Sequence, residues 1–303
     1  MSSAPGANLK RNPLCGRNFE YFSEDPYLAG KLAAGFIRGA EAQGVGTSLK
    51  HFAANSQELC RFTSDSILDE RTLRELYLTA FEIAVKEGRP STVMCAYPRL
   101  NGTHCSDSKM LLTDILRTEW GFDGMVVTDW GVMNDRIEGF RAGCDLNMPG
   151  GSAYMEKEVL AALKTGTLPE RCVDDSARQV LKLALRAAQT QKEKASCDYE
   201  AHHALAGKAA AEGAVLLKNE GGILPLNMNT KIAVIGAMAK NLRYQGAGSS
   251  HIQPTKLPQP LDFLPDAVYA PGCSDRGDTS DALLLEAKAA ATCGSCHRFC
   301  GPT

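Results

Sequence analysis

The chain has 303 residues, of which 44% are hydrophobic, and its formal net charge is −2. This length and apolar content suffice for one large domain or one and a half ordinary ones. The near-neutral charge gives no general attraction for nucleic acid or an anionic membrane, and no apolar run approaches the ~18 residues of a membrane-spanning helix. Residues 1–6 have neither the basic nor the apolar region of a signal peptide, so no signal peptide is predicted there.

The first two thirds of the sequence predict helices that alternate with short strands. Ser23 is expected to cap a helix that has Pro26 in its first turn and runs toward Gly44. A strand is predicted over residues 45–52. A second helix begins after Asp69, and its apolar residues recur at three- and four-residue spacing, which is typical of an amphipathic helix.

The alternation continues with strands over residues 91–97, 124–131 and 142–148, a helix over 108–120 and two further helical stretches. Short strands with little polar alternation, each separated from the next by a helix, indicate a parallel sheet covered on both faces. The pattern fits a (β/α)8 barrel and also a doubly wound open sheet. Both architectures place working residues at the carboxyl ends of the strands.

From about residue 197 the character of the sequence changes. The polar stretch 190–196 predicts a linker after a long helix. A helix over 204–212, a strand over 214–218, an α/β segment that starts at 231–236 and a flexible loop over 244–250 are expected to follow. These elements predict the beginning of a second α/β domain.

Eleven cysteines are scattered at irregular spacing, and their odd number argues against a disulfide framework and favours a reducing compartment. One cluster at the end of the chain contains Cys293, Cys296, His297 and Cys300. It could be a metal or redox site, or an accidental tail. A zinc ion needs about four ligands, and these three cysteines and the histidine would all have to bind it from within about eight residues. We therefore predict no metal site there.

Polar side chains stand at the ends of three successive predicted strands: Lys50 and His51, then Tyr97, then Asp129. A capping or turn role is the commonest one for an Asp after a strand. However, the next residue is Trp130, a good platform for a sugar ring. An ionised carboxylate at a strand end can act as the nucleophile of glycosyl transfer, provided that a second carboxyl flanks the scissile bond.

Other candidates are ambiguous by themselves. Lys50 could simply reach solvent from the edge of the core, and His51 could be a buried residue whose hydrogen bonds are all made within the core. However, several further polar residues follow them as far as Arg61. Arg17 lies in a glycine-containing loop. The glycine cluster at 246–250 does not link a strand to a helix in a G-x-G-x-x-G pattern, so a dinucleotide site is not favoured.

Taken together, several segments resemble glycoside hydrolase family 3, in its β-glucosidase-type branch. They are residues 11–26, 50–58, 93–97 with 101–102, 126–131, 212–219 and 246–250. The match extends over about residues 5 to 290. Residues 53–58 resemble the glucosidase branch more than the branch that cleaves N-acetylglucosaminides. The resemblance implies an α/β protein: an incomplete (β/α)8 TIM-type barrel followed by the start of an α/β-sandwich domain.

The resemblance also implies roles for individual residues. Asp129 matches the catalytic nucleophile, which forms a covalent glycosyl-enzyme. The residues that match sugar-binding positions are Arg17, Lys50, His51, Arg61, Met94, Tyr97, Trp130 and either Ser249 or Ser250. The family's reaction retains the anomeric configuration and uses two carboxyls about 5–5.5 Å apart, without a metal or other cofactor.

Domain boundaries follow from the resemblance: a partial barrel over 1–189, a linker over 190–203, a partial sandwich domain over 204–292 and an atypical Cys-rich tail over 293–303. A complete barrel domain typically needs about 250 residues, so we expect the chain to be truncated at both ends. The acid/base Glu of this branch would lie deeper in the second domain. We therefore expect little or no turnover from this chain.

The predicted function is a retaining glycoside hydrolase that releases terminal non-reducing β-D-glucosyl, or related, residues from a glucoside or a β-linked oligosaccharide. Two alternatives stay open: a non-catalytic or misfolded remnant, such as a sugar-binding pseudoenzyme, and a nucleotide-binding α/β protein. No nucleic-acid or membrane partner is predicted. The preferred sugar, the linkage and the oligomeric state are not determined at this point.

Overall fold

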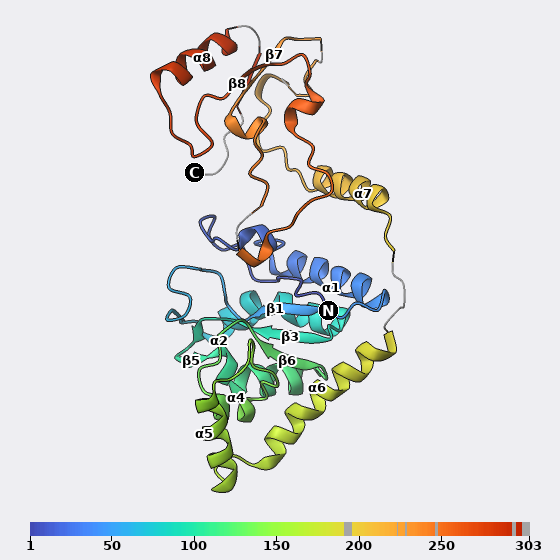
Figure 1. Cartoon of the computed structure of the whole chain (residues 1–303), viewed down its shortest axis with the longest axis vertical. Coiled ribbons are helices and arrows are strands. Elements are labelled where there is room, and N and C mark those ends of the chain that lie inside the picture. The colour runs from blue at the N-terminus through green and yellow to red at the C-terminus, as the bar shows by residue number, and fades with distance from the viewer. Residues whose placement is uncertain (191–195, 223, 228, 246–247, 293–294, 299–303) are drawn as a thin grey trace. The chain divides into compact units, whose positions relative to one another are not determined.

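The computed structural model describes residues 1–190, 196–222, 224–227, 229–245, 248–292 and 295–298. The chain divides into two compact units, residues 1–195 and residues 196–303, and each unit has a parallel sheet of its own (Figure 1). In the part of the chain that the structure describes, no helix has the length and apolar character needed to cross a membrane.

The main sheet of the first unit has three parallel strands in the order β1-β3-β6, which lie side by side in Figure 1. These strands are β1 (Ser48–Phe52), β3 (Thr92–Cys95) and β6 (Met125–Thr128). All three were predicted, and nearly every residue in them is buried. Because Thr92 pairs with both Ser48 and Met125, the strands start level and their carboxyl ends meet at one edge.

Extended segments flank this sheet on both sides. Beside β1, the Lys50 N–H donates to the Pro5 carbonyl at 2.9 Å. Beside β6, Leu146 forms a single bridge with Val127. The strand predicted over 142–148 is therefore reduced to one bridge, because its first residue still belongs to a helix and the chain must turn before it can pair.

The helices of the first unit surround the sheet. Their bounds are α1 (Pro26–Ala42), a continuous helical run of α2 (Glu70–Thr72), η2 (Leu73–Leu78), α3 (Thr79–Ile83) and η3 (Ala84–Gly88), then η5 (Met110–Glu119), α4 (Arg136–Ala142), α5 (Ala153–Lys164) and α6 (Glu170–Thr190). Short helical turns are η1 (Asn18–Glu20) and η4 (Cys105–Asp107).

Local capping explains where these helices begin. The predicted cap Ser23 is wrong: the Asp25 carboxylate accepts from the first N–H groups of α1, and the Ser23 hydroxyl accepts from the Asp25 N–H instead. Asp69 caps α2 as predicted, through the Thr72 N–H. Helix α4 was not predicted. Its cap is Asp135, and only seven residues follow before Gly143 ends it in a left-handed conformation.

The core forms where α1 and the 70–88 helix pack on the sheet. Phe52 makes edge-to-face contacts with Phe81 at 5.3 Å and with Trp120 at 5.8 Å between ring centroids. A Cβ on Gly30 would lie only 2.9 Å from the Ile83 side chain. Glycine at this position therefore lets the two helices approach closely enough to cover the strands.

A small sheet organises the loops at the carboxyl ends of the strands. It consists of β2 (Asp65–Ser66), β4 (Arg99–Leu100) and β5 (Thr103–His104). Asn101 and Gly102 both have positive φ and form the tight turn between β4 and β5, for which an Asn-Gly pair is well suited. The Asn101 side chain also binds both backbone groups of Leu68, so the loop after β1 is tied to the loop after β3.

A buried carboxylate anchors the start of β6. Asp145 Oδ2 accepts from the Val126 N–H and from Arg117 Nη2, each at 2.7 Å. Burial, only partly opposed by the charge of Arg117 and these hydrogen bonds, raises the pKa of Asp145 from 3.8 to about 6. The folded state therefore binds this proton more tightly than the unfolded state does.

A pH dependence of stability follows from this raised pKa. As pH rises from about 4 through about 6, Asp145 must ionise in a buried place, so its contribution to the free energy of unfolding falls. The variant Asp145→Asn cannot ionise, and its unfolding free energy is expected to lose this slope. Urea unfolding of both proteins across that pH window is the measurement. Equal slopes in the two proteins would show that another group is responsible.

The second unit has the parallel strand order β8-β7-β9. Its elements are α7 (Tyr199–Glu212), η6 (Glu220–Gly222), β7 (Ile232–Ile235), η7 (Ala237–Ala239), η8 (Gly248–Ser250), η9 (Pro260–Phe263), β8 (Val268–Ala270), α8 (Asp281–Ala291) and β9 (Ser295–Arg298). The strand at the start of the 231–236 segment is confirmed as β7.

Two predictions for this unit need correction. The strand predicted over 214–218 is wrong: these residues form no regular structure, no described strand pairs with them, and Leu217 is 92% exposed. Helix α7 begins at Tyr199, five residues before the predicted start, because Asp198 caps it. The predicted Cys-rich tail lies largely outside the described residues, and of 295–298 only the backbone strand is described.

Candidate active site

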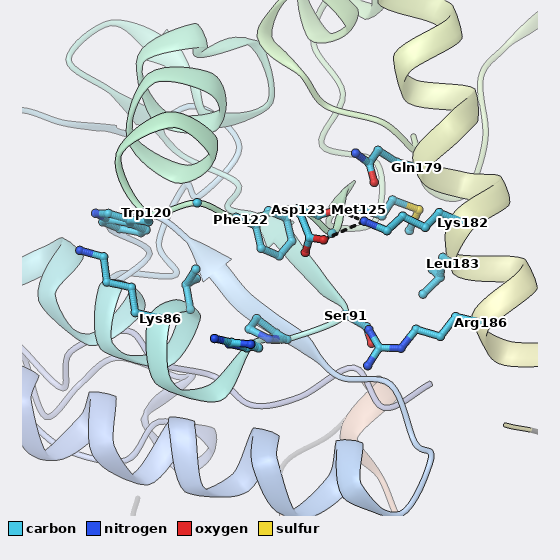
Figure 2. A pocket seen from close by; sticks show the side chains of 15 residues that line it. Lys86, Ser91, Trp120, Phe122, Asp123, Met125, Gln179, Lys182, Leu183 and Arg186 are labelled. Atoms are coloured by element: carbon cyan, nitrogen blue, oxygen red, sulfur yellow. Dashed lines mark hydrogen bonds and ion pairs between the residues drawn. The ribbon is translucent and has the colours of Figure 1, made fainter. Parts of the chain in front are cut away.

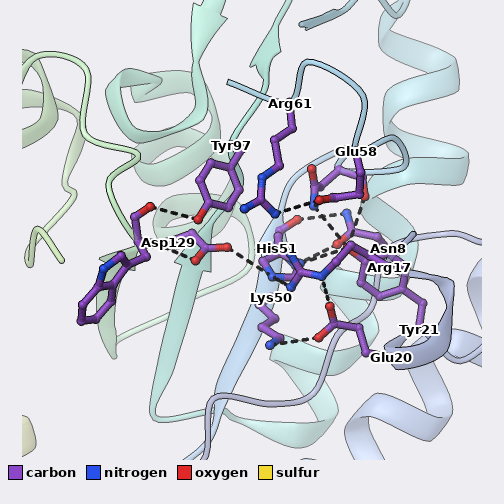
Figure 3. Close-up of polar contacts among 12 residues, drawn as sticks. Asn8, Arg17, Glu20, Tyr21, Lys50, His51, Glu58, Arg61, Tyr97 and Asp129 are labelled. Carbon is purple, nitrogen blue, oxygen red and sulfur yellow. Dashed lines mark hydrogen bonds and ion pairs between the residues drawn. The ribbon is translucent and has the colours of Figure 1, made fainter. Parts of the chain in front are cut away.

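The polar residues predicted at the strand ends do come together (Figure 3). Lys50 and His51 belong to β1, Tyr97 follows β3 by two residues, and Asp129 comes directly after β6. Arg17 reaches the same place from the loop just before η1. The level strand starts explain this convergence, because they bring the exits of all three strands to one edge.

Asp129 is a mostly buried carboxylate with a side chain 16% exposed. Its Oδ1 accepts from the Trp130 N–H at 2.6 Å, and its Oδ2 lies 3.3 Å from His51 Nε2. The capping alternative does not apply, since no helix starts here and α4 uses Asp135 as its cap. The Tyr97 hydroxyl donates to the Trp130 carbonyl at 2.9 Å, and burial together with the charge of Asp129 raises the pKa of Tyr97.

Two cations beside Asp129 share one carboxylate. Glu20 pairs with Arg17 and also lies 3.0 Å from Lys50 Nζ. All three side chains are less than one fifth exposed. Burial opposes the charge of Arg17, but the hydrogen bond and charge of Glu20 outweigh it and raise the pKa of Arg17. The shared carboxylate therefore holds the head groups of Arg17 and Lys50 in fixed directions.

His51 is fully buried at the centre of the cluster. Burial, followed by the charges of Arg17, Lys50 and Arg61, lowers its pKa well below the usual value, so the imidazole is neutral near pH 7. The Asn8 side chain holds the His51 backbone at both its N–H and its carbonyl, at 2.8 and 3.0 Å.

Arg61 packs over the ring of Tyr97. Its guanidinium carbon lies 3.9 Å from the Tyr97 ring centroid, in cation–π geometry, and Glu58 binds its Nη1 at 2.7 Å. Phe62 packs edge-to-face on the same ring, with 4.7 Å between the centroids. Tyr97 is thus fixed between a cation and an aromatic ring, with its hydroxyl directed toward the residues after β6.

The remaining predicted site residues lie as follows. Met94 is half-buried in β3, and Trp130 is 61% exposed next to Asp129. Ser249 and Ser250 lie in η8 of the second unit, so their contact with a sugar stays a prediction.

Four residues of the cluster were not predicted as site residues: Asn8, Glu20, Tyr21 and Glu58. The acidic residues had a detectable signal, because Arg17–Glu20 and Glu58–Arg61 are ion pairs at three-residue spacing. Each of these carboxylates accepts from a cationic side chain and serves to orient it. Tyr21 and Asn8 gave no local signal, since they reach His51 from 30 and 43 residues away.

A cavity of about 460 Å³ lies at the opposite ends of β3 and β6, next to α6 (Figure 2). Lys182 binds Asp123 at 2.8 Å and Arg186 binds Glu41 at 3.1 Å along its wall. Because this cavity lies before the starts of β3 and β6 and not at their carboxyl ends, the cluster around Asp129 is the stronger candidate for chemistry. Among the described residues, no group of three or more His, Cys, Asp or Glu is placed to hold a metal ion.

Comparison with known proteins identifies the family. The model of the glycosyl hydrolase family 3 N-terminal domain matches residues 1–183, and that of the family's C-terminal domain matches residues 214–293. Thermostable β-glucosidase B of Acetivibrio thermocellus is 52% identical over 95% of this chain. An exo-α-(1→6)-L-arabinopyranosidase of Bifidobacterium longum is 45% identical over 92% of it.

Solved structures agree with these matches. The family 3 β-glucosidase of Bifidobacterium adolescentis superposes with a TM-score of 0.90, at 44% identity, over 98% of this chain and 44% of its own. β-Glucosidase 3B of Thermotoga neapolitana, in complex with glucose, gives a TM-score of 0.81, at 41% identity, over 96% of this chain and 41% of its own. The chain spans 39% of the length of each of the two curated relatives. With an α/β fold, a family model covering more than half its residues and these structural matches, the chain belongs to glycosyl hydrolase family 3.

Proposed function

We propose that this chain carries the sugar site and the nucleophile of a retaining β-glycosidase. The observation that carries the proposal is the place of Asp129: a largely buried carboxylate at the end of β6, facing a cluster of fixed cations and a neutral imidazole. Charged donors held in fixed directions suit several hydroxyls on one ring. An exposed indole beside the carboxylate suits the apolar face of that ring.

The reaction follows from this arrangement. Asp129 would attack the anomeric carbon and form a glycosyl ester as the aglycone leaves, and water would then release the sugar. Arg17, Lys50, His51 and Arg61 would hold the hydroxyls. Glu20 and Glu58 are occupied with orienting cations, so we assign the proton donor to a group outside this cluster. We therefore expect little turnover by this chain of substrates with poor leaving groups.

The proposed substrate is a terminal non-reducing β-D-glucosyl residue. The names of the relatives support this choice and also point to one competitor, an L-arabinopyranosyl residue. For the fold, we propose an incomplete (β/α)8 barrel in the first unit and the start of an α/β sandwich in the second. The parallel strands β1, β3 and β6 and the strand order β8-β7-β9 support this.

The proposal is tested with a 2-deoxy-2-fluoro-β-D-glucoside that carries a dinitrophenyl leaving group. Such a leaving group needs little acid assistance, so the glycosylation step can proceed without the proton donor. We expect one covalent fluoroglucosyl group per chain, on the peptide that contains Asp129, by mass spectrometry. A label on another carboxylate would refute the assignment of the nucleophile.

A melting experiment separates a working pocket from a misfolded remnant. We expect a cooperative thermal transition whose midpoint rises with glucose, because a ligand that binds only the folded state stabilises it. The matching arabinopyranose is the comparison sugar. Aggregation without a transition would support the remnant, and a midpoint raised by nucleotides alone would support the nucleotide-binding alternative.

A further inference from the structure

His51 makes three polar contacts through its two ring nitrogens (Figure 3). Nε2 lies 2.7 Å from Arg17 Nη2 and 3.3 Å from Asp129 Oδ2. Nδ1 lies 3.1 Å from the Tyr21 hydroxyl. A neutral imidazole has a single N–H, so only one of the two nitrogens can be a donor.

Arg17 decides the state of Nε2. A guanidinium has donors only and is always charged in proteins. The 2.7 Å contact is therefore a hydrogen bond only if Nε2 carries a lone pair. A proton on Nε2, directed at Asp129, would place two N–H groups against each other at this distance. The proton of His51 must then be on Nδ1.

The surroundings of Tyr21 are consistent with this assignment. Its hydroxyl donates to the Asn55 carbonyl at 3.3 Å and accepts from Asn55 Nδ2 at 3.2 Å. One lone pair of the hydroxyl is left, and it faces Nδ1 of His51. Burial raises the pKa of Tyr21, so the phenol keeps its proton and this pattern of bonds is maintained.

We propose that Tyr21 is a positioning residue which holds His51 in the Nδ1–H tautomer, so that Nε2 presents a lone pair beside Asp129. The inference rests on the proposed function, because it assigns a protonation state to a member of that site. In this state His51 cannot donate a hydrogen bond to Asp129. The carboxylate keeps its lone pairs for the anomeric carbon. The single lone pair of Nε2, which accepts from Arg17 in this structure, can accept a hydroxyl proton of the sugar only in place of that bond.

Long-range ¹H–¹⁵N spectroscopy of protein labelled at its six histidines reads this tautomer directly. We expect one imidazole whose signals stay constant between about pH 5.5 and pH 8, as burial of His51 requires. Its spectrum should show a hydrogen on Nδ1 and none on Nε2. An Nε2–H pattern, or a doubly protonated ring, for this histidine would overturn the proposal.

The variant Tyr21→Phe removes the acceptor and keeps the ring. We expect its buried imidazole to populate both tautomers, and labelling of Asp129 by the fluorinated glucoside to slow by up to about tenfold, the size of one lost neutral hydrogen bond. The matched control is Tyr27→Phe, which should change neither readout, because Tyr27 lies on α1 and is 61% exposed. Unchanged nitrogen signals in Tyr21→Phe would refute the positioning role.

The two proposals can fail separately. If the wild-type protein shows the Nδ1–H pattern but does not react with the fluorinated glucoside, the glycosidase proposal is refuted and the tautomer assignment stands. Labelling of Asp129 together with an Nε2–H pattern would do the reverse.

Discussion

Asp129→Asn is expected to reduce labelling by the fluorinated glucoside by on the order of 10⁶-fold, the scale seen when a catalytic nucleophile is removed. The amide is nearly the same size and cannot form the glycosyl ester. The Oδ1 bond to the Trp130 N–H can be kept by the amide oxygen, so the local backbone is not expected to change. The measurement is the rate at which the modified mass appears, in variant and wild type side by side.

The same strand offers a matched control. Asp123 lies two residues before β6, and it binds Lys182 at the opposite end of the sheet. Asp123→Asn should be labelled at the wild-type rate. If the two variants slow labelling equally, the loss reflects damage to β6 and not chemistry at its carboxyl end.

Glu20→Gln is expected to destabilise the protein by about 3 kcal/mol, because it leaves two mostly buried cations, Arg17 and Lys50, without their shared carboxylate. Breaking a buried pair by removing one partner is costly, since the remaining charge stays out of water. Glucose should also raise the melting temperature less than in the wild type. Urea unfolding monitored by circular dichroism gives the first quantity, and thermal melts with glucose give the second.

An exposed pair provides the comparison for Glu20. Lys31 and Glu87 form an ion pair in which both side chains are about 40% exposed. Glu87→Gln should change the unfolding free energy by less than about 0.5 kcal/mol, because water already solvates both charges. Equal effects of the two substitutions would mean that the cluster at Glu20 is solvated in solution.

Elements with a strong local pattern were predictable from the sequence. Strands β1, β3 and β6 and the helix after Asp69 lie where periodicity places them. The failures have different origins, in missing pairing partners, in the choice of capping residue and in short elements. The apolar run 214–218 has strand character, but no described strand pairs with it. Helix α4 has only seven residues, too few for a periodic signal to stand out.

Four site candidates, Asp129, Lys50, His51 and Tyr97, were predictable from the sequence. Each stands at or near the end of a predicted strand, and parallel strands end at one edge of a sheet. The part played by Tyr21 could not be predicted in this way, because its contact with His51 spans 30 residues and depends on the packing of the loop before α1. The sequence alone therefore determined the family, the parallel sheet and the strand ends at which chemistry could occur. The tertiary structure decided which cations share a carboxylate and which nitrogen of His51 carries the proton, because charge state and hydrogen-bond direction depend on burial and on distant neighbours.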